Sequence, residues 1–238
     1  MPFSEMVDSP APAAITAPAA ATLTADAYLN VGSQYVYRGV ALRDSGPVAT
    51  AAFTLSHRRG WFIDGWAGQI DTRDYYDNSI TREWQIELNA GYAAQLNDAW
   101  QWSLSRAWID GIDSKLFKSQ NYQEWRLNLF YRDSAAAQFA YTDNYRQLGW
   151  PSWNAEIKYQ YALTSVFDSE FGLGHSHGAG SRDSDYNYGW TGLRTQWLKT
   201  DWSLRWIYSS PDAAYVIDKN RTGSRIEFTL SWLLPVLR

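Results

Sequence analysis

Apolar and polar residues alternate along most of the chain from residue 27 onward, whereas the spacing of apolar residues that marks an amphipathic helix is hard to find. Between Glu83 and Tyr92, for example, Trp, Ile, Leu, Ala and Tyr alternate with Glu, Gln, Glu, Asn and Gly. This alternation predicts an all-β chain with twelve strands, at residues 27–38, 47–57, 61–71, 82–95, 99–110, 121–132, 135–145, 153–163, 167–177, 186–197, 201–209 and 223–233.

The connections between the predicted strands alternate in length. Those after even-numbered strands are tight turns, such as 58–60 and 96–98. Most of those after odd-numbered strands are longer and rich in Gly, Asp, Asn and Ser, such as 111–120 and 210–222. Short periplasmic turns and longer extracellular loops are typical of outer-membrane barrels. The pattern therefore predicts an antiparallel barrel with both termini on the periplasmic side.

Alternation alone would also suit a soluble β-sandwich or a lipocalin-like barrel. The predicted strands, however, run to about 10–12 residues, whereas strands of soluble proteins average about 5–6. Trp and Tyr also gather near strand ends, as at Trp61, Trp100, Trp153 and Trp197, which is typical of interfacial aromatic girdles. We therefore predict a 12-stranded antiparallel transmembrane β-barrel of the bacterial outer membrane, with membrane lipid as the partner of its apolar face.

Composition narrows the function classes. The chain has 238 residues with a net charge of −4, which argues against a nucleic-acid-binding protein. It contains no Cys, so disulfides, thiolate catalysis and Cys-ligated zinc are excluded. No apolar run reaches the roughly 18 residues that a transmembrane helix needs. The first residues are rich in Ala and Pro, and we expect 1–26 to be a flexible segment that precedes a barrel of residues 27–238.

The first predicted hairpins carry a family resemblance. Ser33-Gln-Tyr-Val-Tyr-Arg-Gly39, Asp44-Ser-Gly-Pro47 and Gly60-Trp-Phe62 resemble motifs of the Gcw_chp family of uncharacterised proteobacterial proteins, as do Gly91-Tyr92 and Asn121-Tyr-Gln-Glu-Trp125. The resemblance covers roughly residues 27–132. It implies an outer-membrane-type barrel of unknown activity and supplies no catalytic residues.

The polar face of the predicted strands carries charges of both signs. If the apolar face meets lipid, the residues expected to line the lumen or a constriction are Arg38, Glu83, Glu87, Glu124, Arg126, Glu156, Lys158, Glu170, Arg205, Arg225 and Glu227, together with Arg132, Asp168 and Arg194. One interpretation is a paired ion network that fills and stiffens the barrel, because buried charges need partners. The other is a constriction with facing acidic and basic walls that selects small polar or zwitterionic solutes.

Three positions, Arg106, Trp66 and Trp190, do not fit the alternation. Arg106 shares the apolar parity, where an Arg at the membrane midplane would cost about 2–4 kcal/mol. We therefore expect it near the loop-side interface or at a bulge. Residues 61–71 and 186–197 give no clean parity, which leaves Trp66 and Trp190 without a predicted side.

His175-Ser176-His177 suggests either a hydrolase or a metal site. In a regular strand the Ser176 hydroxyl points away from both imidazoles, which argues against a nucleophile–base pair. The two histidines share one face and could bind a metal with Asp183 or Asp185, but no further ligand spacing supports this. Asp71, Asp74 and Asp77 lack the pattern of a calcium loop. We predict no cofactor and no metal, and the sequence favours no enzymatic activity.

Two further features bear on function. Gly172-Leu-Gly174 lacks the helix of a nucleotide motif, so we expect these glycines to relieve crowding in a curved strand. Residues 146–153 offer aromatic side chains as a docking surface for a protein partner.

The sequence predicts a narrow porin-like channel for small solutes, because the interior of a twelve-stranded barrel is wider than that of the filled eight-stranded barrels and narrower than that of the open 16- to 18-stranded ones. The alternatives are a non-conducting structural or partner-binding barrel and, third, an outer-membrane hydrolase.

Overall fold

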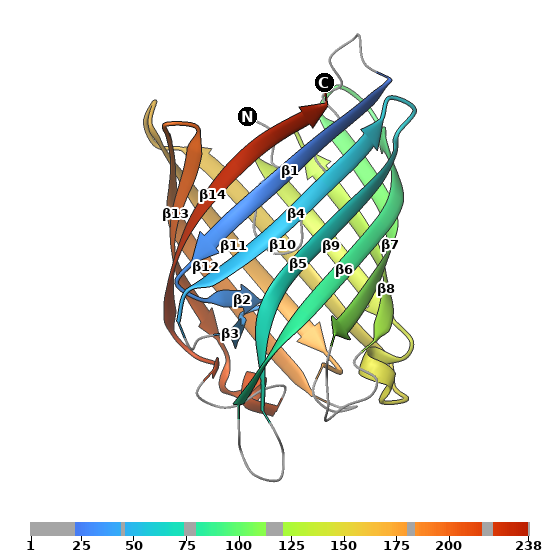
Figure 1. The fold of residues 1–238 in the computed structure, drawn as a ribbon, viewed down its shortest axis with the longest axis vertical. Coiled ribbons are helices and arrows are strands. Elements are labelled where there is room, and N and C mark those ends of the chain that lie inside the picture. Colours follow the sequence, from blue (N-terminus) through green and yellow to red (C-terminus); the bar gives the residue numbers. More distant parts are fainter. Residues whose placement is uncertain are drawn as a thin grey trace.

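The computed structural model describes residues 22–43, 46–73, 80–112, 121–179, 184–215 and 221–237. Twelve long strands close into an antiparallel barrel, in which each strand pairs with its neighbours in the chain and β1 pairs with β14 (Figure 1). The strands of the barrel are β1 (Leu23–Gly32), β4 (Val48–His57), β5 (Trp61–Arg73), β6 (Ile80–Gln95), β7 (Trp100–Ile112), β8 (Tyr122–Tyr131), β9 (Ala135–Thr142), β10 (Ser152–Ala162), β11 (Phe167–His177), β12 (Asp185–Trp197), β13 (Thr200–Ser209) and β14 (Arg225–Leu237).

The predicted fold class is confirmed, and most strand boundaries agree closely with the alternation. The first strand is shifted: β1 begins at Leu23 rather than at residue 27 and already ends at Gly32. The predicted strand 121–132 ends one residue earlier, at Tyr131, and β14 continues to Leu237. Residues 1–21 lie outside the described residues, so the flexible N-terminal segment stays a prediction. No helix among the described residues is long and apolar enough to cross a membrane.

The two faces of the strands differ in exposure as the alternation predicts. On β6, Trp84 and Leu88 are 48% and 44% exposed, whereas Glu83 and Glu87 are only 3% and 6% exposed. The same division holds on most of the other strands, where large apolar side chains point outward and charged ones inward, whereas β5 and β12 carry large apolar side chains on both faces. A water-soluble protein would bury these apolar side chains. The barrel is therefore inverted relative to a soluble one, with its apolar surface outside.

A small hairpin lies inside the barrel. Its strands, β2 (Tyr35–Tyr37) and β3 (Val40–Arg43), pair only with each other, and Figure 1 shows them in the half of the barrel away from the start of β1 and the end of β14. Val36, Val40, Ala41 and Leu42 are all buried. The prediction that residues 33–38 continue the first strand is therefore wrong: the chain leaves the wall after Gly32 and turns into the lumen. We call residues 35–43 the lumen hairpin.

The lumen hairpin is surrounded by an apolar core inside the barrel. The core joins the hairpin to inward-facing side chains of the wall and the loops, namely Tyr28, Val48, Ala52, Trp66, Ile70, Tyr145, Ala179, Tyr186, Tyr188, Trp190, Ile207 and Ala213. Two short 3₁₀ helices lie in the loops at the same end, η1 (Tyr145–Gln147) and η2 (Pro211–Tyr215). This half of the lumen is packed with side chains, among them the charged Arg38 of the hairpin, and further charged residues line the rest of the interior.

Candidate functional site: the charged lumen

Four alternating charges form a continuous chain from the lumen hairpin along one side of the inner wall. Both guanidinium nitrogens of Arg38, on the lumen hairpin, donate to the carboxylate of Glu124 on β8, at 3.0 and 2.9 Å. Arg126 Nη2 donates to Glu124 at 3.1 Å and to Glu87 on β6 at 3.1 Å. We call Arg38, Glu124, Arg126 and Glu87 the lumen ion chain. It ties the hairpin to two strands of the wall.

The strand geometry explains this arrangement. Glu124 and Arg126 are two residues apart on β8, so both side chains point to the same face. All four charges are nearly inaccessible to solvent, and an ionised group so buried is costly without a partner. The two-pronged contact between Arg38 and Glu124 supplies the strong, oriented hydrogen bonds that such a pair requires. Burial also raises the pKa of the neighbouring Tyr37, whose ring lies under the Arg38 guanidinium at 4.7 Å, so the phenol stays neutral.

A second group of charges lies on the other side of the ring of strands. Arg205 on β13 donates from Nε to Glu227 on β14 at 2.8 Å, and the same nitrogen lies 3.9 Å from Glu170 on β11. Nearby, Arg194 donates to Asp201 at 3.0 Å. Because β13 and β14 stand opposite β7 and β8 in the strand order, the two groups lie on facing walls, and each wall carries both acidic and basic side chains.

A third group links the wall to the lumen hairpin. Lys158 pairs with Glu156 at 2.9 Å, and the Tyr188 hydroxyl donates to the same carboxylate at 2.8 Å. The Tyr188 ring packs so closely against the hairpin turn that a Cβ added at Gly39 would lie 2.3 Å from Tyr188 Cβ. Gly39 also has a φ of +76°, which glycine adopts without strain, so two constraints hold glycine at this turn.

The structure places most of the expected lumen residues inside the barrel, close to an opposite charge. Buried or nearly so are Arg38, Glu83, Glu87, Glu124, Arg126, Glu156, Lys158, Glu170, Arg194, Arg205 and Glu227. Arg225 is half-buried and donates to Gln34 at 3.3 Å, and Asp168 accepts from Gln160 at 3.0 Å. Arg38 reaches the lumen from the hairpin rather than from the wall. The expectation for Arg132 is wrong: it is exposed in the turn after β8, with a φ of +47°.

The inward aromatic residues were missed because their strands lack a clean parity. Trp66 and Trp190 are both buried inside the barrel, where the Tyr35 ring of the hairpin stacks on Trp66 at 4.9 Å between centroids. Strands β5 and β12 carry large apolar groups on both faces because the inner face packs against the hairpin. Glycines make the space on β11: a Cβ added at Gly172 would lie 2.0 Å from Trp190 Cζ2. Gly172 therefore relieves crowding, as expected, because the Trp190 ring occupies the space that a side chain at this position would need.

The His175-Ser176-His177 segment does not form a hydrolase site. Ser176 is buried, whereas both histidines lie on the outer face beside Trp153. His177 Nδ1 lies 2.5 Å from the Asp185 carboxylate, and His175 Nδ1 lies 2.9 Å from Asn187 Oδ1. Among the described residues no group of three His, Cys, Asp or Glu side chains could hold a metal. Three residues considered as metal or calcium ligands, Asp74, Asp77 and Asp183, lie outside the described residues.

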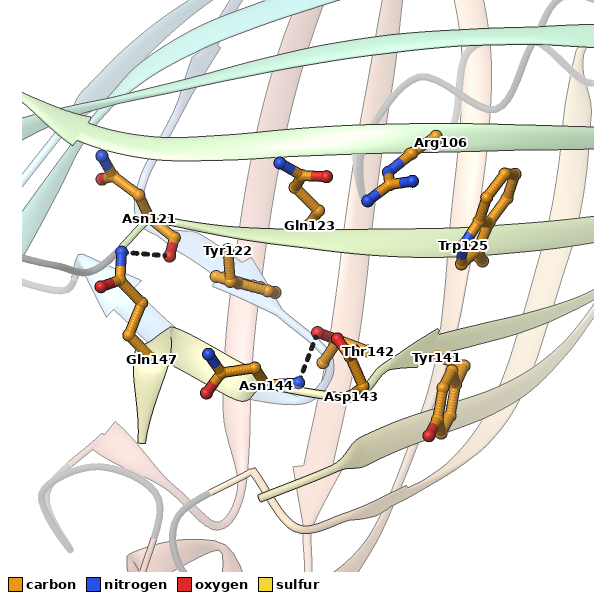
Figure 2. Close-up of a pocket in the computed structure, with 10 residues that line it drawn as sticks. All are labelled: Arg106, Asn121, Tyr122, Gln123, Trp125, Tyr141, Thr142, Asp143, Asn144 and Gln147. Atoms are coloured by element: carbon orange, nitrogen blue, oxygen red, sulfur yellow. Dashed lines mark hydrogen bonds between the residues drawn. The ribbon is translucent and has the colours of Figure 1, made fainter. Parts of the chain in front are cut away.

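Arg106 lies on the outer face towards the loop side, as its parity predicts. Its guanidinium lies over the Trp125 ring at 5.2 Å, and it lines a pocket with loop residues (Figure 2). The strand is regular at this position, and Arg106 pairs with Ala90 on one side and with Trp125 on the other. No bulge is needed to accommodate the charge.

A closed barrel of twelve strands with an apolar exterior and an ion-paired interior has the fold of the porin-like outer-membrane β-barrels. Solved structures with this fold match over most of their length. A KdgM porin aligns with a TM-score of 0.54 at 9% identity, covering 87% of this chain and 98% of that one. A NanC porin gives 0.52 at 10% identity, with 89% and 100% covered. The COG4313 outer-membrane channel of Pseudomonas putida F1 gives 0.53 at 9% identity, with 92% and 97% covered.

These similarities establish the fold alone, because the sequence identities are so low. No family model and no curated protein matches the sequence. The resemblance to the Gcw_chp family is therefore not confirmed beyond the barrel fold.

Proposed function

We propose that this chain is a bacterial outer-membrane barrel that forms a narrow channel for small polar or zwitterionic solutes. The observation that carries the proposal is the pairing of an apolar exterior with a lumen whose facing walls bear both signs of charge, in the lumen ion chain and around Arg205. A zwitterionic solute can meet an opposite charge for each of its own charged groups on either wall, whereas a solute of one charge also meets like charges on both walls. Membrane lipid would surround the outer face.

The orientation follows from the connections. Short turns lie at the end where β1 begins and β14 ends, and the longer loops lie at the other end. In outer-membrane barrels the short turns are periplasmic. We infer that both ends of the barrel-forming segment face the periplasm and that the lumen hairpin occupies the extracellular half.

The lumen hairpin sets the width of the proposed channel. It enters from the extracellular end and is fixed by Arg38 to the β8 wall and by Tyr35 to the β5 wall. A solute must therefore pass beside the hairpin. This restricts the proposed cargo to small molecules, in line with the narrow interior of a twelve-stranded barrel.

One observation favours a second candidate, a non-conducting structural or partner-binding barrel. The apolar core around the lumen hairpin fills part of the lumen with aromatic rings, among them Trp66, Tyr188 and Trp190. In that case the loop of residues 146–153 would be the docking surface for a protein partner. Its Leu148 is exposed, although the Trp150 indole is fixed by a 2.9 Å hydrogen bond to the Gly178 carbonyl.

Swelling of proteoliposomes separates the two candidates. The barrel is refolded into vesicles, and its insertion is verified by the heat-dependent shift of its gel mobility. The proposal expects swelling in isotonic glycine and little or none in sucrose, because the channel is narrow and has charges of both signs. Verified insertion without swelling in any solute contradicts the channel and supports the non-conducting barrel.

A further inference from the structure

The outer wall of the barrel has a pocket of about 570 Å³ at the loop side, between β7, β8 and β9. Its lining combines one cation, Arg106, with one carboxylate, Asp143, and with the polar side chains of Asn121, Gln123 and Asn144. Asp143 is an exposed loop residue, whereas Arg106 stands on the strand wall. Figure 2 shows the Arg106 guanidinium between the side chains of Gln123 and Trp125. The volume lies within the range of about 300–1,000 Å³ that is typical of small-molecule sites.

The pocket forms because two strands separate. The pairing of β8 with β9 ends at Trp125 and Tyr141, although β8 extends further, to Tyr122. Beyond that last pair the chain of β9 turns into η1, whose Gln147 side chain donates to the Asn121 carbonyl at 3.1 Å. A segment of β8 therefore borders the pocket without a strand on that side.

Arg106 has no anionic partner among the residues that the structure describes. None of the ion pairs there includes it, and its Nε is buried without a hydrogen-bond partner. Its guanidinium carbon lies over the Trp125 ring, within the distance of a cation–π interaction. In the lumen, by contrast, Arg38, Arg126 and Arg205 each contact a carboxylate.

The level of Arg106 on the barrel is set by the strand register. Arg106 pairs with Trp125, Trp125 with Tyr141, Tyr141 with Trp153 and Trp153 with His177. These outward residues form a row across five strands that runs obliquely around the barrel, because the strands are tilted (Figure 1). Arg106 shares its pocket with the loop residues Asp143, Asn144 and Gln147, so its guanidinium reaches the loop-side edge of the apolar wall, where lipid headgroups would lie.

We propose that this pocket binds the phosphate of an anionic lipid of the outer leaflet, with Arg106 as the charged ligand and Gln123 as a neighbouring hydrogen-bond donor. The inference rests on the proposed outer-membrane location. A lipid supplies both parts of the fit: its phosphate meets the unpaired guanidinium, and its acyl chains lie on the apolar wall below, along Leu104 and Leu127, which are exposed. A free anion would contact the guanidinium but would leave the apolar wall uncovered.

The test uses the whole barrel in detergent and lipid A, a phosphorylated glycolipid, as the probe. Native mass spectrometry measures lipid A retained by the unchanged protein and by Arg106→Gln. We expect the substitution to weaken retention by about tenfold or more, the value of one lost charge-assisted hydrogen bond. Arg132→Gln is the matched control, because Arg132 also lies over a ring, Tyr131 at 5.4 Å, but is in a turn at the opposite end. It should retain lipid A as the unchanged protein does.

Three results overturn the proposal. These are equal retention by Arg106→Gln and the unchanged protein, equal retention of lipid A from which the phosphates have been removed, and displacement of lipid A by millimolar inorganic phosphate, which would indicate a site for free anions. Heat-dependent gel mobility verifies that each variant is folded. A barrel that inserts and conducts but retains no lipid A refutes only this inference, whereas failure to insert into vesicles refutes the proposed location.

Discussion

The Tyr35 ring stacks on the indole of Trp66, with 4.9 Å between centroids and 26° between the planes. Tyr35 belongs to the lumen hairpin and Trp66 to the β5 wall, so this contact joins a segment that has left the barrel back to the wall. Arg43 of the hairpin also donates to Gln69 of β5. Towards β8, Arg38 reaches Glu124. The hairpin is thus held to the wall by aromatic, polar and ionic contacts.

Loss of the ionic anchor should destabilise the barrel. Removing one partner of a buried ion pair typically costs about 3–5 kcal/mol. Because Glu124 keeps Arg126, we expect Arg38→Met to lower the free energy of unfolding by about 3 kcal/mol, the low end of that range. Urea unfolding in detergent micelles, followed by Trp fluorescence, measures the change.

A second substitution checks the cause of that loss. In Arg38→Met with Glu124→Met no unpaired carboxylate is left, and Arg126 keeps Glu87, so this double variant should be more stable than the Arg38→Met variant. If Arg38→Met is as stable as the unchanged protein, the lumen ion chain does not hold the hairpin.

Crowding at Gly172 gives a second prediction. A Cβ at this position would lie 2.0 Å from the Trp190 ring, so Gly172→Ala forces the indole or the strand to move. Overpacking of this kind costs about 1–3 kcal/mol. Trp190→Leu should relieve it, and the double variant should therefore be more stable than the sum of the two single effects implies. Additive effects in the same urea assay would mean that the ring and the glycine are independent.

The third prediction concerns which side of the wall meets lipid. The chain has no Cys, so Leu104→Cys carries a single thiol for a fluorescent label on the exposed outer face. In vesicles, lipids with brominated acyl chains should quench this label, and aqueous iodide should not. A label at Asp98→Cys, in the exposed turn before β7, should behave in the opposite way. Iodide quenching at position 104 would indicate a water-soluble protein.

The barrel wall could be predicted from the sequence because most of its strands have one face towards an apolar surrounding and the other towards a polar lumen. On β6 the alternation of Glu83, Trp84, Gln85 and Ile86 shows which side chains face the lumen and which face outward. The lumen hairpin could not be predicted in this way, because packing covers both of its faces. Consecutive apolar residues at Val40, Ala41 and Leu42 were the one available indication, since a strand buried on both faces loses its alternation.

The lining of the lumen was predictable residue by residue, but its pairings were not. Parity places Glu124 and Arg126 inside, yet it carries no information on which charge each one meets. Arg38 and Glu124 are 86 residues apart in the chain, and their contact depends on how far the hairpin turns inward. The same limit applies to Trp66, whose inward position depends on Tyr35.

Single-channel conductance in planar bilayers tests the central claim most directly, by comparing the unchanged barrel with one that lacks the lumen hairpin. Gly32 and Val48 are paired neighbours, so a two-residue Asn-Gly turn can replace residues 33–47 without disturbing the wall. A second variant, Tyr35→Ala with Arg38→Ala, keeps the hairpin but removes its stacking on Trp66 and its ion pair with Glu124. The account predicts a small, steady conductance for the unchanged barrel and a severalfold larger one for both variants. Equal conductance in all three, or silence of all three after verified insertion, would contradict it.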